Sequence, residues 1–420
     1  MTHVRRWLGL ATAAALLVSS AGCGGNDDDE ASTSASTSAT VKSYEKSVAG
    51  VVEASEAFLA TLDDDQKAEV QLELTEENAV AWSNLPCGST CRPGIAFSDL
   101  DESQLAAAKS VLKTALGAET DSGYARVEQL LLADDYLADA QGSSSSSSSG
   151  PGGGMSGGPG GGMSGGPGGG MSGGPGGGMS GGPGGGMSGG PSGGSSSGGG
   201  MGGYGSGLYY LAFLGAPSVT GTWQLNFGGH HLAVHMTYKS GKVTGASPFF
   251  VGVEPTSWTD DSSTTHAPLA DMKTALLAMT GSLSAAEQKK AKLSQTFTDV
   301  LVGPQEDGQF PETKQGLAVS GLTDAQKKLV LAAIAPWVAG ADDATATALL
   351  ATYEDELDKT YIGWSGTTAL EAHADYVRID GPSVWVEFVC QNGIVIQDQI
   401  HYHTVYRDHT RDYGGEFSFS

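Results

Sequence analysis

Basic residues are scarce in this 420-residue chain: 22 lysines and arginines stand against 47 aspartates and glutamates, which gives a formal net charge of −25. A surface with that balance repels polyanions, which argues against nucleic-acid binding and against electrostatic attachment to anionic lipid. Long apolar runs are also scarce, and no segment after the N-terminal region is long enough to span a bilayer. The composition suits a solvated, exported protein and does not identify a substrate.

Cysteine is the next scarce residue, with four in the whole chain. Cys87 and Cys91, in LPCGSTCRPG, flank a Gly-Ser-Thr turn, so in an oxidising compartment we predict a local disulfide between them. Two cysteines alone lack the four ligands of a structural zinc site. Cys390 lies in an apolar strand, where we expect a buried free thiol.

The N-terminus suggests where the protein is located. A basic start, MTHVRR, precedes the apolar run WLGLATAAALLV and the small-residue segment SSAGC. This pattern resembles the lipobox of bacterial lipoproteins, although Ser20 stands where that motif prefers leucine. The resemblance implies a signal peptide over residues 1–22, lipidation of Cys23 as a membrane anchor, and a polar tether over 23–40. The mature protein would be a lipoprotein of the cell envelope, exposed to the periplasm or the cell surface, and ordinary secretion is the alternative.

A low-complexity segment over residues 142–205 cannot contribute to a core. It contains PGGGMSGG five times without error from Pro151 to Gly190. Glycine and proline at this density leave little to bury, so we expect a disordered spacer rich in Gly, Met and Ser. The regularly spaced methionines offer thioether ligands for Cu(I). We favour expansion of the repeat by replication slippage, because nothing fixes the geometry of such ligands.

A diverged internal repeat is more informative. GIAFSDLDESQ, from Gly94 to Gln104, is similar to GLAVSGLTDAQ, which ends at Gln326, and each follows an earlier helix start. The separation of Gln66 from Gln104 equals that of Gln288 from Gln326. The two similar segments and the two earlier helix starts, at Gln66 and Gln288, each have a polar capping residue followed by a helical stretch. We therefore predict an internal duplication.

The predicted fold class is α+β, with two related halves about a pseudo-twofold axis, each made of helices followed by antiparallel strands. Segregation of helices from strands along each half favours an antiparallel sheet over a doubly wound fold. We align YYLAFLGAPSV with DYVRIDGPSV, TWQLNF with VWVEFV, and GGHHLAVHMTY with IHYHTVYRDH. The helical regions are 41–141 and 266–359, and the strand regions are 206–265 and 360–420.

Histidines mark the last strand of each aligned half. His401 and His403 alternate along a predicted strand and share one face. His230 and His231 are adjacent, and the preceding FGG allows a bulge or turn that points both one way. If the halves pack together, three or four imidazoles meet. Such a set suits a divalent transition metal such as Zn, Cu or Fe better than Ca or Mg. Exposed or hydrogen-bonded strand histidines are the alternative.

Two further residues are candidates for catalysis. Glu387 is the nearest candidate for a general base or a further ligand, and Arg407 lies on the face of His401 and His403. A structural ion pair explains both equally well. The sequence contains no GxSxG elbow, P-loop or dinucleotide fingerprint. The remaining hypotheses are a metal-dependent hydrolase or oxidoreductase, a non-catalytic metal- or ligand-binding lipoprotein, and a structural surface protein.

Three segments also carry a family resemblance: GHHLAVHMTY, YVRIDGPSVWVEFV and HYHTVYRDHTRDYGGEF. They resemble the bacterial and fungal family catalogued as domain of unknown function 3500. The resemblance extends from about Val41 to Phe417 and excludes the Gly/Met spacer. It implies one fold and a shared site location, and it implies no activity.

Overall fold

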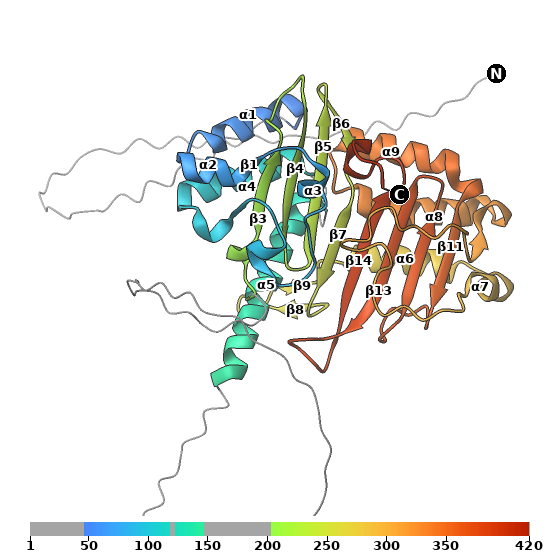
Figure 1. Cartoon of the computed structure of the whole chain (residues 1–420). Coiled ribbons are helices and arrows are strands. Elements are labelled where there is room, and N and C mark those ends of the chain that lie inside the picture. The colour runs from blue at the N-terminus through green and yellow to red at the C-terminus, as the bar shows by residue number, and fades with distance from the viewer. Residues whose placement is uncertain (1–45, 118–121, 147–202, 420) are drawn as a thin grey trace, which may run out of the picture. The chain divides into compact units, whose positions relative to one another are not determined.

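The computed structural model describes residues 46–117, 122–146 and 203–419 (Figure 1). The predicted signal peptide, the tether and the methionine repeat lie outside these residues. Within the described part of the chain, no helix combines the length and hydropathy needed to cross a membrane.

The helices form two groups along the chain, which agrees with the predicted α+β class. The first group consists of α1 (Val48–Leu59), α2 (Asp64–Val70), α3 (Glu76–Ala79), α4 (Glu102–Ala115) and α5 (Gly123–Ser146). The second consists of α6 (Ala270–Gly281), α7 (Ala285–Ala291), α8 (Asp324–Val338) and α9 (Asp343–Glu356). Helix α5 continues beyond residue 142, where the low-complexity spacer was expected to begin.

The four helix starts found in the sequence are confirmed. Each begins with a capping box, in which the cap side chain accepts from a backbone N–H and a side chain three residues later binds back to the cap. The four cap residues are Asp63, Asp101, Ser284 and Thr323.

Nearly all strands join one large sheet that runs through the centre of the described fold (Figure 1). Its main path is β1-β3-β4-β5-β7-β14-β13-β12-β11-β10, with β2 beside β3 and β6 beside β5. The pairs are antiparallel except that of β1 with β3. The strands of the first half are β1 (Gln71–Leu72), β2 (Ile95–Ala96), β3 (Tyr210–Leu214), β4 (Thr222–Gly229), β5 (Leu232–Lys239), β6 (Lys242–Gly245) and β7 (Phe249–Val253). Those of the second half are β10 (Leu317–Ala318), β11 (Tyr361–Ser365), β12 (Tyr376–Asp380), β13 (Val384–Asn392) and β14 (Ile400–Asp408), and a separate pair is β8 (Trp258–Thr259) with β9 (Thr265–His266).

The sheet order corrects the strand alignment made from the sequence. That alignment matched β5 with β14. In the sheet, β14 and β7 are neighbours at the middle, and β5 and β13 lie one strand farther out on either side. Position therefore relates β14 to β7 and β13 to β5. The duplication itself stays a prediction.

The two faces of the sheet have different covers. On one face, Trp337 of α8 donates its indole N–H to Thr404 Oγ1 at 2.8 Å, and Tyr353 of α9 lies 2.6 Å from the Tyr406 hydroxyl. The opposite face lies under two long connections, called loops below: residues 73–94, which include the short helix α3, and residues 294–316. There Trp82 packs with Val405. Because side chains alternate along β14, the odd-numbered residues from His401 to Arg407 all point to the loop side.

Both cysteine predictions are confirmed. Cys87 and Cys91 form a disulfide, and Cys390 is a buried free thiol.

His235 of β5 is a buried histidine with a defined partner. Its Nδ1–H donates to the carbonyl oxygen of Pro248 at 2.7 Å. Burial lowers the pKa of His235 to about 4, because the interior disfavours the charged ring. The folded protein therefore holds this ring neutral at pH values where an unfolded chain protonates it.

This difference predicts that His235 lowers the stability of the folded protein at acidic pH. Below pH 6.5 the unfolded state takes up a proton that the folded state refuses until about pH 4, so stability falls as the pH is lowered. Between pH 6.5 and pH 5, one such histidine lowers the free energy of unfolding by about 2 kcal/mol. His235→Gln keeps an N–H donor and removes the titration, so urea unfolding at the two pH values should show a correspondingly smaller loss. The exposed His373→Gln serves as the control, and an unchanged pH dependence in His235→Gln would contradict this assignment.

Candidate metal centre

The sheet brings histidines from two distant segments to one place. His401 and His403 point from β14 to the loop side. His230 and His231 form the two-residue turn between β4 and β5, flanked by the pair Gly229 and Leu232. The turn foreseen after FGG is therefore present, and His231 adopts a left-handed φ of 63°. Strand β7 lies between β5 and β14, so the two histidine segments meet across an intervening strand.

Three of these rings point their Nε2 atoms toward one another. The Nε2 atom of His403 lies 3.1 Å from that of His231 and 3.2 Å from that of His401. All three side chains are buried, with exposed fractions of 6% for His231, 1% for His401 and 5% for His403. Two imidazole nitrogens bound to one first-row metal ion lie at most about 4.2 Å apart, because each metal–nitrogen bond is about 2.0–2.1 Å. Both distances from His403 meet this limit, and the ligand atoms of all three histidines lie within 4.8 Å of one another, so the three side chains could hold one metal ion.

Gly252 of β7 makes room for two of the rings. It pairs with His403 in the sheet, and its N–H donates to the carbonyl oxygen of His231 at 2.7 Å. A Cβ atom at position 252 would lie 2.8 Å from Cδ2 of His231 and 2.9 Å from Cδ2 of His403. The missing side chain is therefore what lets imidazoles from the β4–β5 turn and from β14 approach each other across β7.

The electrostatics keep two of the rings neutral. Burial, followed by the nearby rings of His230, His403 and His401, lowers the pKa of His231 well below its ordinary value. Burial and then His403 lower the pKa of His401 to about 3. An unprotonated imidazole offers a lone pair to a metal ion. Protonation of these rings therefore competes with a metal ion only at a pH lower than the value near 6.5 expected for free histidine.

Asp299 sets the orientation of the third ring. Its Oδ1 lies 3.0 Å from Nδ1 of His403. Burial acts to raise the pKa of Asp299, but hydrogen bonds from the His403 ring and from neighbouring N–H groups outweigh it, so the pKa is lowered. An ionised carboxylate only accepts, so Nδ1 carries the hydrogen and Nε2 is left with its lone pair directed at the other two rings.

His230 was predicted as a fourth ligand and lies beside the three-ring cluster. Its ring stacks on His231 with the centroids 3.7 Å apart. Its Nδ1 lies 2.7 Å from Oδ1 of Asp134 on α5, and the Tyr209 hydroxyl donates to its carbonyl oxygen at 2.6 Å. The structure therefore brings together three of the four predicted ligands.

Glu387 and Arg407, predicted for catalysis, lie beneath a loop. Glu387 accepts from the backbone N–H groups of Leu301 and Val302 and from the Tyr376 hydroxyl, and burial raises its pKa. Arg407 donates to the carbonyl oxygen of Val302 and pairs with a nearby aspartate at 2.6 Å. These contacts fasten residues 301–307 to the sheet, and neither side chain lines the cavity described next.

A cavity of about 510 Å³ opens beside the three rings. Its walls come from the two loops over the sheet, from the end of β13 and from the segment just before β3. Among the described residues, no lysine or arginine lines it. Lining residues besides the histidines include Ser83, Asn84, Tyr204, Asp299, Glu306 and Gln391.

Residues 44–415 match the family described as protein of unknown function, DUF3500. The chain belongs to this family. The match covers the helices, the sheet and both histidine segments, which confirms the resemblance seen in the sequence. No curated protein and no solved structure shows significant similarity to the chain. The function of this DUF3500 protein therefore has to be argued from the site itself.

Asp299 and Gly252 are the residues of the site that the sequence did not reveal. Asp299 lies in an irregular loop, 104 residues before His403. Gly252 lies inside a strand, where glycine signals close approach of another group but does not say which one. Only the sheet register identifies the two rings that approach it.

We predict that Gly252→Ala weakens metal binding by this DUF3500 protein at least about tenfold, the scale seen when groups supporting metal ligands are lost. The new methyl group would push apart the rings of His231 and His403. Zinc affinity measured by isothermal titration tests this. Gly321→Ala is the matched control, because a Cβ atom there meets nothing within 4 Å. Equal affinity in both variants would show that the rings do not depend on the space above Gly252.

Proposed function

We propose that this DUF3500 protein binds one transition-metal ion through the Nε2 atoms of His231, His401 and His403, and that it is a metal-dependent hydrolase. The observation that supports the site is the convergence of these nitrogens at 3.1 and 3.2 Å. Neutral imidazoles favour zinc, copper or iron over calcium or magnesium, which prefer oxygen ligands.

The open side of the cluster supports catalysis. Structural zinc sites are closed by four protein ligands, whereas catalytic sites use three and leave one position for water or substrate. Here the three rings border a cavity of about 510 Å³. A metal ion in such a site lowers the pKa of bound water to about 7 and polarises a substrate carbonyl or phosphoryl group. An oxidoreductase would use the same open position with copper or iron.

Metal capture without catalysis is the second candidate. The positions of Glu387 and Arg407 favour it, because both are bound to the 301–307 loop and neither reaches the cavity. The two candidates differ in turnover. Hydrolysis of ester, amide or phosphoester substrates that is lost on metal removal and returns with zinc supports the enzyme, and stoichiometric binding without turnover supports capture.

We also propose that the two halves arose by duplication. A repeated contact supports this. The side-chain amide of Gln104 donates to the carbonyl oxygen of Thr61 at 3.0 Å, and that of Gln326 donates to the carbonyl oxygen of Ser282 at 3.1 Å. The two contacts span 43 and 44 residues, so they are similar in the two halves without being identical. On this proposal the site lies at the junction of the halves, where β7 meets β14.

Export to the cell envelope is part of the proposal. The lipobox-like N-terminus supports lipidation at Cys23, and the Cys87–Cys91 disulfide suits an oxidising compartment. The anchor would hold the protein at a membrane, and the acidic balance argues against nucleic acid as a partner.

Lipidation can be tested directly. In a bacterial host supplied with radiolabelled palmitate, the wild-type chain should incorporate label and Cys23→Ser should not, because the thiol is the acceptor in lipoproteins of this type. Cys390→Ser should label like the wild type. Label in the Cys23→Ser variant would place the modification elsewhere.

The metal site has its own test. Untagged wild-type protein, dialysed against zinc and then against buffer, should retain about one equivalent of metal by mass spectrometry, in keeping with a three-histidine site. His401→Ala/His403→Ala should retain none, with unchanged circular dichroism. His373→Ala, which removes an exposed histidine outside the cavity, should bind like the wild type. A folded wild-type protein without metal would refute the site.

A further inference from the structure

A single arginine joins the disulfide loop to the turn that carries His231. The Arg92 side chain is buried, and its Nη2 donates to the carbonyl oxygens of Ser83 at 2.8 Å, Leu85 at 2.5 Å and Gly229 at 2.7 Å. Gly229 is the last residue of β4, directly before the His230–His231 turn. The guanidinium therefore fixes the loop and the turn to each other.

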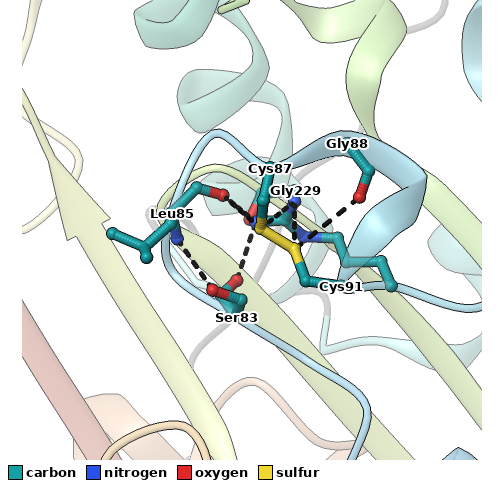
Figure 2. The surroundings of a disulfide bond; sticks show 7 residues. Ser83, Leu85, Cys87, Gly88, Cys91 and Gly229 are labelled. Atoms are coloured by element: carbon teal, nitrogen blue, oxygen red, sulfur yellow. Dashed lines mark hydrogen bonds between the residues drawn. A yellow bond between two sulfur atoms is a disulfide. The ribbon is translucent and has the colours of Figure 1, made fainter. Parts of the chain in front are cut away.

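The disulfide lies against the same guanidinium. Nη1 of Arg92 is 3.6 Å from the Sγ atoms of both Cys87 and Cys91. Figure 2 shows the sulfur pair beside Ser83, Leu85 and Gly229, the residues whose carbonyl groups Arg92 binds. The bond closes a short surface turn in which Ser89 and Thr90 are exposed. Its sulfurs are thus close to the protein surface, while the arginine beside them contacts Gly229, next to the His230–His231 turn.

The loop also contacts the site directly. Ser83 and Asn84 are buried and line the cavity. The Asn84 side-chain amide lies 3.4 Å from Nδ1 of His403. The segment just before the disulfide turn therefore touches one proposed ligand, His403, and Arg92, just after the turn, holds the turn of another, His231, through Gly229.

We propose that the Cys87–Cys91 disulfide is a redox latch that positions the metal centre, with Arg92 as the positioning residue. This inference rests on the proposed metal site. In the closed latch, one covalent bond limits the conformations of residues 87–91, which connect Leu85 to Arg92, and so helps to keep the guanidinium on the carbonyl groups of Ser83 and Leu85. In the open latch, the two sulfurs separate, the loop loosens around Arg92, and the His231 turn loses part of its support.

The opening reaction is thiol–disulfide exchange with a small dithiol. A thiolate of the dithiol attacks one cysteine sulfur, the Sγ–Sγ bond breaks, and the other cysteine leaves as a thiolate. The second dithiol sulfur then attacks the mixed disulfide and releases the first cysteine. Two electrons pass to the protein, the dithiol ends as a cyclic disulfide, and its two protons end on the cysteines. The positive charge of Arg92 stabilises the departing thiolate.

Cys87→Ser/Cys91→Ser opens the latch permanently and removes thiols that would themselves bind zinc. We expect zinc affinity about tenfold weaker than in the wild type, the lower end of the range for lost supporting groups. We also expect faster amide hydrogen exchange across residues 229–232. Cys390→Ala, which removes the buried free thiol, is the matched control and should change neither. Arg92→Lys keeps the charge with fewer donors and should weaken zinc binding in the same direction.

Reversal separates a latch from a merely structural bond. Wild-type protein reduced with a dithiol, and freed of it before the measurement, should exchange faster at residues 229–232 and should recover on reoxidation. If the wild type binds zinc and the serine pair matches it in affinity and exchange, the latch is overturned and the metal site stands. If the folded wild type binds no zinc, the metal site is overturned and the latch on it falls as well.

Discussion

The site depends on one constraint: two imidazoles must meet across strand β7 at Gly252, a residue that has no side chain. His231 and His403 belong to segments that never pair with each other, because β7 separates them. Their Nε2 atoms still come within 3.1 Å, since Gly252 leaves open the space into which both rings lean. The register of β7 with β14 places Gly252 opposite His403, so one backbone pairing at the middle of the sheet fixes the geometry of the cluster.

The polar residues beneath the loops explain how the segment that covers the cluster is held in place. Buried charges are tolerated when they are paired or hydrogen-bonded, and here the partners belong to the covering loop. Glu387 binds the N–H groups of Leu301 and Val302, and Arg407 binds Asp307. The same loop supplies Asp299 to His403. The residues expected to act on a substrate thus hold in place the segment that orients a ligand.

Local rules recovered much of this fold, and long-range packing set the rest. Capping at Asp101 and Thr323, the co-facial pair His401 and His403, and the Cys87–Cys91 bond depend on neighbours along the chain, so the sequence is sufficient for them. The strand correspondence failed because a turn with glycine and proline follows both β3 and β12, although these strands occupy different places in the sheet. Asp299 acts on His403, 104 residues away, and Gly252 acts between His231 and His403, which belong to two different segments, so no spacing rule applies.

The turn between β4 and β5 shows how a strained, buried segment is held ready for a ligand. His231 has a φ of 63°, which is uncommon for a residue with a side chain. Three successive carbonyl oxygens of the turn each accept from a different element: Gly229 from Arg92, His230 from Tyr209, and His231 from Gly252. Buried carbonyl groups need such partners, and here the partners also prevent the turn from relaxing. A ring held in this way loses little freedom when it binds an ion, so its support favours affinity. Of the three donors, only Arg92 also contacts a disulfide, Cys87–Cys91, which a reductant can break.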